Sequence, residues 1–259
     1  GHVLSYKGDI IETYYYSTSY GHTGDYEAWN LDKDAYGYLQ GVWVRSEENP
    51  IDLSDEKSFL DYISNVDSAC YESDLKYFRW NTVLDFQGKD ETLLHTIADR
   101  KEHQPEAISY YKDASKTETT DSCSNFGSLQ AINVVKRNQS GVILELELEF
   151  QNGAVSVQSE YNMRAILGCG ITNINLLDGS SVEMSILPSA YISIQAKGDG
   201  TYAVLGGGYG HGIGMSQNGA QKLCGQGFDY KRILNYFYQD TELTELYQPQ
   251  NTTKEEGGA

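Results

Sequence analysis

The sequence has little proline and no long apolar run. Only 4 of its 259 residues are proline. No stretch approaches the roughly 18 consecutive apolar residues that a membrane-spanning helix needs, so we expect no membrane insertion by this segment. Residues 1–7, GHVLSYK, also lack the basic start and long apolar centre of a secretory signal peptide. We therefore interpret the chain as a piece that begins partway into a protein, with any targeting segment upstream.

Basic residues are scarce as well. The chain has 19 Lys and Arg against 37 Asp and Glu, a formal net charge of −18. This balance argues against nucleic acid as a partner, because phosphate contacts need clustered Lys and Arg. It argues equally against binding to anionic membranes. A neutral or zwitterionic polymer remains allowed, and solubility alone is the plainer interpretation.

Metal-binding patterns are missing too. The four cysteines, Cys70, Cys123, Cys169 and Cys224, include no CxxC pair, and no HExxH or similar ligand pair occurs. We therefore expect neither a metal nor a cofactor. Four thiols permit three disulfide pairings, among which the sequence does not choose, and buried free thiols are the alternative.

Several segments have the alternation of β-strands. The clearest is 142–150, where Val142, Leu144, Leu146, Leu148 and Phe150 alternate with mostly acidic residues. The Asn152–Gly153 pair that follows indicates a hairpin with a return strand at 154–157. Further strands are predicted in residues 3–20, with a turn at 7–9, and at 77–86, 190–195 and 201–205.

Helices are predicted at 54–65, at 90–98, at 160–167 and near the C-terminus. Asp52 or Ser54 can cap the first, Ser216 a helix over 217–224, and Asp229 a last one. Residues 99–125 show no clear periodicity and are interpreted as variable surface. The sum is an α+β fold: a strand-rich mixed domain at 1–247, with a helical insertion near 50–76, C-terminal helices, and a polar tail at 248–259.

Glycines alternate with other residues between positions 208 and 214, in the segment GYGHGIG. In an extended chain this spacing removes the side chains from one face, so that another backbone or a flat sugar can approach closely. The spacing GxGxxG is not met, no GK[ST] follows, and Ser216 is outside any GxSxG elbow, which argues against nucleotide binding and against an esterase. A tight sheet edge that leads into a helix is the structural alternative.

His211 is the one side chain of this segment expected to titrate near neutral pH, although a lone histidine is often a hydrogen-bonded structural residue. His22 lies in a second loop rich in small residues, 17–24. The two histidines would share a site if the two loops meet, and the spacing alone does not decide this.

Residues 208–220, GYGHGIGMSQNGA, resemble the signature of the SpoIID/LytB family, which comprises stage II sporulation protein D and the LytB amidase enhancers. Other stretches resemble the family's "vLtYnG…a.Y.STSGG.T", "sG..fR..LG", "LPSa" and "A…G.SY..IL.HYY" elements. They occur in the same order, at residues 3–23, 159–168, 187–190 and 220–238. The resemblance thus extends over almost the whole chain.

Membership would imply peptidoglycan glycan strands as the substrate. It would also imply an extracytoplasmic location, in the cell wall or anchored to the membrane through a segment missing from this chain. Stage II sporulation protein D is a lytic transglycosylase, which leaves a 1,6-anhydro sugar without using water. One carboxylic acid with a raised pKa protonates the leaving oxygen and then, as carboxylate, assists attack by the sugar's own 6-hydroxyl. The alternative is a non-catalytic glycan-binding module or amidase enhancer of the LytB type, with other wall hydrolases as partners. The resemblance does not separate a role in sporulation from one in vegetative growth.

Two departures from the family pattern matter. The family's catalytic Glu belongs to a segment resembling "GEMP…ALKAQAVAARTYA", which no stretch of this chain matches, so we expect the acid upstream and this chain alone to be inactive. Glu12 and Glu27 are the only stand-ins within the chain, and each is also interpretable as a solvated surface carboxylate. Tyr20 replaces a frequent Gly and would narrow a groove or offer a ring to a sugar.

The resemblance also nominates residues that would line or brace a glycan groove. His211 and Gln217 would contact sugar hydroxyls or N-acetyl groups. Arg164 would hold a lactyl or peptide carboxylate, or alternatively form an internal ion pair. The full set expected at the binding site is Ser17, Ser19, His22, Arg164, Tyr209, His211, Ser216 and Gln217.

Overall fold

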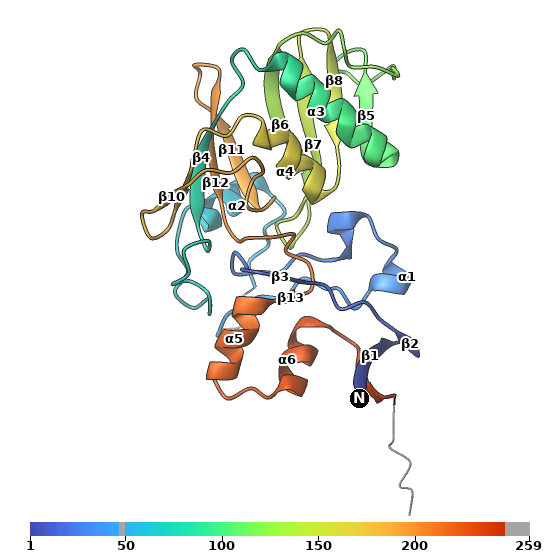
Figure 1. The fold of residues 1–259 in the computed structure, drawn as a ribbon, viewed down its shortest axis with the longest axis vertical. Coiled ribbons are helices and arrows are strands. Elements are labelled where there is room, and N and C mark those ends of the chain that lie inside the picture. The colour runs from blue at the N-terminus through green and yellow to red at the C-terminus, as the bar shows by residue number, and fades with distance from the viewer. Residues whose placement is uncertain (47–49, 247–259) are drawn as a thin grey trace, which may run out of the picture.

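The computed structural model describes residues 1–46 and 50–246. It confirms a mixed α+β fold, drawn in Figure 1. The tail predicted at 248–259 lies outside the described residues. None of the described helices is long and apolar enough to cross a membrane.

Two antiparallel sheets form the upper half of the molecule in Figure 1. A four-stranded sheet has the order β5-β8-β7-β6, with bounds Ile108–Tyr111, Gly153–Val157, Ile143–Phe150 and Leu129–Arg137. A five-stranded sheet has the order β10-β9-β4-β12-β11, with bounds Ser181–Val182, Ile174–Leu176, Trp80–Asp85, Thr201–Gly206 and Ile192–Ala196. Strand pairs of high sequence separation, such as β4 with β12, join distant parts of the chain here.

Smaller sheets lie at the waist and below it. Strand β3 (Tyr15–Tyr16) pairs in parallel with β13 (Met215–Ser216). Strand β1 (His2–Tyr6) pairs with β2 (Asp9–Ile10) and with β14 (Glu242–Glu245). The waist strands therefore bring residue 15 next to residue 215, and Figure 1 shows them between the two halves.

Helices cover the sheets and complete the lower half. They are η1 Tyr26–Trp29, α1 Lys33–Tyr36, α2 Glu56–Ile63, α3 Asp90–His103, η2 Pro105–Ala107, α4 Glu160–Gly168, α5 Gln217–Gly225 and α6 Tyr230–Phe237. The predicted caps of α5 and α6 are confirmed: the Ser216 side chain accepts from Gly219 N, and that of Asp229 from Arg232 N. The cap of α2 is Asp55, not Asp52 or Ser54.

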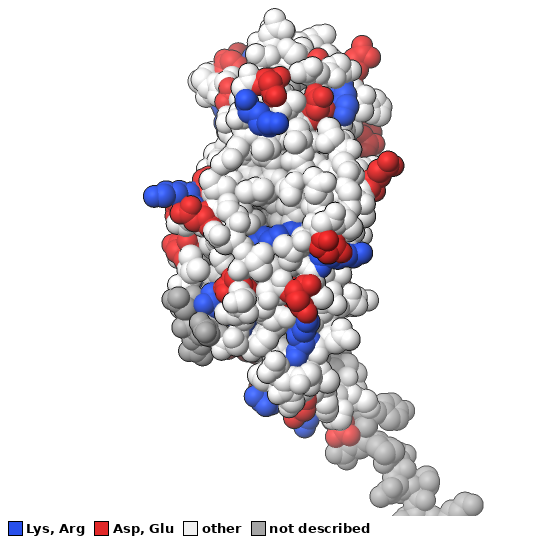
Figure 2. Space-filling model, turned by 90° about the vertical axis from the view of Figure 1, so that its left-hand side faces the viewer, with Lys and Arg blue, Asp and Glu red and all other residues white. Residues whose placement is uncertain are grey.

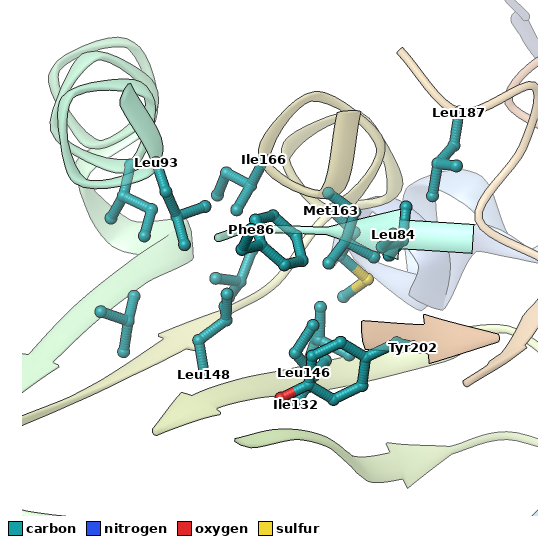
Figure 3. Packing of buried hydrophobic residues seen from close by; sticks show 14 of the residues in the cluster. Leu84, Phe86, Leu93, Ile132, Leu146, Leu148, Met163, Ile166, Leu187 and Tyr202 are labelled. Atoms are coloured by element: carbon teal, nitrogen blue, oxygen red, sulfur yellow. The ribbon is translucent and has the colours of Figure 1, made fainter. Parts of the chain in front are cut away.

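Two hydrophobic cores stabilise the fold. In the upper core, Leu93 of α3 and Met163 and Ile166 of α4 pack onto side chains of β4 and β7, as Figure 3 shows. The lower core is rich in tyrosine and includes Tyr20, Tyr38 and Tyr238, all at most 1% exposed. Burying apolar area at roughly 25 cal/mol per Å² makes these two clusters the main source of stability.

The predicted hairpin at 142–157 is confirmed as β7 and β8, with Phe150 opposite Gly153. The predicted apolar face is confirmed at Val142, which is 3% exposed, and wrong at Leu144, which is half-buried. Ile143, predicted on the other face, is 1% exposed and belongs to the core. Register shifts in the β6–β7 pairing, next to Lys136, change which side chains face inward there.

The interpretation of 99–125 as variable surface is also wrong in part. Helix α3 continues to His103, and β5 forms an edge of the four-stranded sheet. Within the described chain all four cysteines are free, so none of the three possible disulfide pairings is formed.

Candidate functional site

The glycine-rich segment does not form an open extended strand. Gly208, Gly210, Gly212 and Gly214 all have positive φ, between 77° and 114°. A Cβ atom at Gly214 would lie 2.2 Å from the Tyr14 carbonyl oxygen. The space left by the missing side chains is therefore taken up by the protein itself, by the backbone of residues 14–18 at Gly208 and Gly214 and by the Tyr191 ring at Gly212.

Hydrogen bonds fix this contact along its length. Thr18 and Tyr209 exchange backbone bonds, with N···O distances of 3.2 and 2.8 Å. Asn218 donates from its side-chain amide to the Ser17 carbonyl at 3.0 Å. The two loops singled out in the sequence, 17–24 and 206–220, thus form one unit.

A buried carboxyl ties this unit together from within. Glu72 is 0% exposed and accepts bonds from the Ser19 amide at 3.0 Å, from the Ser19 hydroxyl at 2.5 Å and from the Ser216 hydroxyl at 2.7 Å. Burial raises the pKa of Glu72 to about 7, and the serine bonds oppose the rise. Ser19 and Ser216, at 2% and 0% exposed, therefore face inward and brace the loops, with no surface left for a ligand.

His211 is held by both ring nitrogens. Nε2 lies 2.9 Å from the Tyr15 carbonyl oxygen, and Nδ1 accepts from the Ile213 amide at 3.1 Å. The bond to a carbonyl requires the proton on Nε2, so the ring is the neutral Nε2–H tautomer. Burial lowers the pKa of His211, which favours the same neutral state. As placed, this ring orients its neighbours and has no free nitrogen for proton transfer.

Next to His211 lies an ion pair. Arg164 Nη1 donates to Glu160 Oε2 at 3.0 Å and its Nε to the Leu187 carbonyl at 2.9 Å. Trp29 Nε1 donates to the other Glu160 oxygen at 3.4 Å, and the Trp29 and His211 ring centroids are 4.9 Å apart. We call Trp29, Glu160, Arg164 and His211 the histidine cluster. Arg164 therefore already has the internal partner that the sequence left as its alternative role.

The histidine cluster borders a cavity of about 390 Å³. Trp29 and Glu160 belong to its lining, together with Asn30, Gln104, Gln158 and the half-exposed ring of Tyr161. Aromatic rings suit the C–H faces of sugars, and side-chain amides suit their hydroxyls. This combination fits a saccharide better than a charged or fully apolar ligand.

The other predicted site residues are placed differently from one another. Gln217 is exposed at the first position of α5, Ser17 is half-buried, and Tyr209 stacks on Tyr77 with ring centroids 4.4 Å apart. His22 is 6% exposed, lies against Trp43, and has its pKa lowered to about 4 by burial. The aromatic neighbours of His22 are Tyr20 and Trp43, whereas those of His211 are Tyr16 and Trp29.

Tyr20 offers no ring to a sugar, contrary to the expectation from its sequence position. The ring is 0% exposed and stacks on Tyr191 at 4.5 Å, with its hydroxyl on the Ser140 carbonyl. At this position, where the family often has Gly, the Tyr20 ring is therefore part of the hydrophobic core.

The two proposed stand-ins for the acid are both exposed. Glu12 accepts from the Tyr14 hydroxyl, and Glu27 accepts from Asn138 Nδ2 at 3.0 Å. Burial raises the pKa of two other carboxyls, Asp25 and Glu72. Glu72 has the raised pKa of a general acid but no access to a ligand, and the sequence carried no local signal for it.

Fold and site together define a class: an α+β domain whose glycine-rich segment is locked onto a serine-rich loop by a buried glutamate. Residues 100–214 match a family model described as a domain of unknown function (DUF8618). The amidase enhancer of Bacillus subtilis (strain 168) is 34% identical over 89 residues, 34% of this chain and 12% of that protein. Stage II sporulation protein D of the same strain is 36% identical over 76 residues, 29% of this chain and 22% of that protein.

These two partial similarities support the resemblance to the SpoIID/LytB family. The matched segments span less than a quarter of either relative. What those two proteins do as wholes therefore enters below only as a proposal.

Proposed function

We propose that this chain binds the glycan strands of peptidoglycan as part of a murein lytic transglycosylase that acts outside the cytoplasm. The observation that carries the proposal is the histidine cluster at the edge of the 390 Å³ cavity with its aromatic and amide lining. The names of the two relatives, which concern sporulation and an amidase, support a cell-wall role of the same kind.

The cluster supplies binding and orientation. The Trp29 ring would stack on one sugar, and the exposed amide of Gln217 would contact an N-acetyl or hydroxyl group. The neutral His211 fixes the Tyr15 backbone and the indole in place at no electrostatic cost to a neutral sugar. A rigid frame of this kind lowers the conformational entropy that the site itself loses when it binds a glycan strand.

The proton donor would come from outside these 259 residues. Bond cleavage needs a carboxylic acid that is both protonated near neutral pH and accessible to the glycosidic oxygen. Glu72 meets only the first condition, and Glu12 and Glu27 are exposed surface carboxylates. The family's glutamate-bearing segment, placed ahead of this chain, would supply the acid.

Two proteins test this: the chain alone, and the chain preceded by the family's glutamate-bearing segment. Both are incubated with purified glycan strands, and products are identified by mass spectrometry. We expect binding by both and 1,6-anhydro products only from the longer protein. Reducing-end sugars would point to hydrolysis instead, and turnover by the chain alone would contradict the upstream placement of the acid.

A second candidate is an amidase enhancer. It is favoured by the paired state of Arg164 and Glu160, which leaves the cluster suited to binding and without an acid of its own. In that case the longer protein would release no anhydro sugar, yet it would raise the rate at which a wall amidase removes stem peptides. Measuring amidase turnover with and without the longer protein separates the two candidates.

A further inference from the structure

The cavity beside the histidine cluster is the end of a longer groove. Two more cavities, of about 570 and 680 Å³, follow it along the surface. The first of these shares Asn30, Gln158 and Ser159 with the cluster cavity, and the two larger ones share Tyr26, Glu27, Lys33, Lys136 and Leu144. We call the three together the long groove.

The long groove runs between two parts of the fold that are distant in sequence. One wall is the segment with η1 and α1, which Figure 1 shows just below α4 and the ends of β6 and β7. The other wall comes from β6, β7 and the start of α4. A row of three adjoining cavities suits an extended polymer better than a compact small molecule.

Its lining repeats the chemistry of the cluster cavity. Tyr26 lines both larger cavities, while Trp29 and Tyr161 line the smallest. Asn30, Gln139 and Gln158 also face the groove, and their side chains have no hydrogen-bond partner among the residues that the structure describes. Rings and unpartnered amides therefore recur along the path, as successive sugars of one strand would require.

Except for Glu106, which lines the cluster cavity, the acidic side chains of the long groove have polar partners. Asn138 donates to both Asp25 and Glu27, and Ser140 donates to Asp25. Lys116 Nζ lies 3.0 Å from Glu145 Oε1, on β7. Asp32 caps α1, and Glu160 is held by Arg164.

The lysines of the groove are not partnered. Lys33 and Lys136 both line the two larger cavities, and neither has an ion pair or side-chain hydrogen bond among the described residues. Lys112, Lys116 and Lys222 are paired with acids, whereas Lys57 and Lys197, like the two groove lysines, have no ion pair or side-chain hydrogen bond among the described residues. Figure 2 shows the same mixing of signs on another face, with no continuous basic patch.

We propose that the long groove holds several sugars of one glycan strand, and that Lys33 and Lys136 bind carboxylates carried by that strand. This proposal rests on the proposed function and adds a path and a chemical preference to it. The carboxylates come from the lactyl groups of a bare strand or from the stem peptides of a substituted one. Chitin oligosaccharides offer the same N-acetylated sugars without any carboxylate.

The test compares K33Q/K136Q with the wild-type chain and with K57Q/K197Q, which removes two exposed lysines outside the long groove. Binding is measured by calorimetry to bare glycan strands, to peptide-bearing strands and to chitin oligosaccharides of matched length. We expect K33Q/K136Q to bind bare strands about 3- to 10-fold more weakly, as the loss of two exposed ion pairs implies. Its affinity for chitin oligosaccharides should stay within about 2-fold of wild type. Loss on peptide-bearing strands alone would assign the stem carboxylates.

The outcomes separate the two proposals. If the wild-type chain binds none of the three ligands, the proposed function fails. If it binds bare or peptide-bearing strands but K33Q/K136Q behaves like K57Q/K197Q, or binds them more tightly than wild type, the proposed function stands and the lysine assignment is overturned. All the lysines replaced are exposed, so the variants fold, and thermal midpoints matched to wild type verify this.

Discussion

Replacing Glu72 by glutamine tests whether the ionisation of this buried carboxyl, which joins the two loops, lowers the free energy of unfolding as the pH rises. In the amide, the remaining oxygen can accept from the Ser19 amide and the Ser216 hydroxyl, as Glu72 Oε1 does now at 3.0 and 2.7 Å. The new NH2 group can donate to the Ser19 hydroxyl oxygen. E72Q therefore keeps the shape of the contact and removes only the ability to ionise.

The size of the effect follows from the pKa. Burial raises the pKa of Glu72 from its ordinary value of 4.5 to about 7. Between these two values the folded chain binds a proton that the unfolded chain has released, so the stabilisation is complete below pH 4.5 and is lost as the pH rises through 7. A shift of this size corresponds to about 3 kcal/mol lost between pH 4.5 and pH 8. For a chain of this length that is roughly 6–12 °C in Tm.

Thermal unfolding of wild type and E72Q at pH 4.5, 6 and 8 provides the measurement. Other groups titrate over the same range, so the informative quantity is the difference between the two proteins at each pH. We expect near-equal stability at pH 4.5 and E72Q more stable at pH 8. E91Q, which removes an exposed carboxyl of α3, is the matched control and should follow wild type at every pH.

A difference between wild type and E72Q that does not change with pH would refute the reasoning. It would mean that ionisation of Glu72 does not change the free energy of unfolding. E72A would show the other half of the effect, since it leaves the buried Ser19 amide without an acceptor and opens a cavity. We expect E72A to lose roughly 3–5 kcal/mol relative to wild type at pH 4.5, and less at pH 8, where wild type carries the cost of ionising Glu72.

Two further substitutions test the frame of the site. R164Q leaves the Glu160 carboxylate, 6% exposed, without its cation, and should cost about 3–5 kcal/mol in urea unfolding. The double variant R164Q/E160Q should recover most of that loss, and equal losses in the single and double variants would show that the pair is not coupled. G214A places a Cβ atom 2.2 Å from the Tyr14 carbonyl oxygen at a φ of 77°, and should lose more than about 2 kcal/mol. Its control is G225A, where nothing lies within 4 Å of the added atom and no change beyond about 0.5 kcal/mol is expected.

Local sequence patterns predicted the elements that depend on neighbouring residues, namely a hairpin and two helix caps. The β7–β8 hairpin follows from alternation and the Asn152–Gly153 turn, and the caps of α5 and α6 follow from Ser216 and Asp229. Strand β6 was not predicted, because buried and exposed side chains do not alternate along it. The side chains of Gln130, Asn133 and Val135 are exposed, and the pairing with β7 shifts register. Its strand character depends on the neighbour and is absent from its own pattern.

The site was predictable only in part for the same reason. The resemblance brought the two loops together, but Glu72, which joins them, is 53 residues from Ser19 and 144 from Ser216. A glutamate in a polar stretch carries no sign of such partners. The long groove likewise combines residues near 30 with residues near 140 and 160, and no sequence window contains both walls.

The most recognisable residues of the family signature face inward. Residues that stabilise the fold can therefore be distinguished from exposed residues that would bind glycan. Gly212 and Gly214 are buried against neighbouring backbone and rings, and Ser216 is bound to Glu72. Substitutions there should act on stability before they act on glycan affinity. Gln217 and the residues of the long groove are exposed, so their substitution should act on affinity with stability unchanged. A signature that codes for a rigid frame leaves substrate preference to residues outside it, and we propose Lys33 and Lys136 of the long groove for that role in this chain.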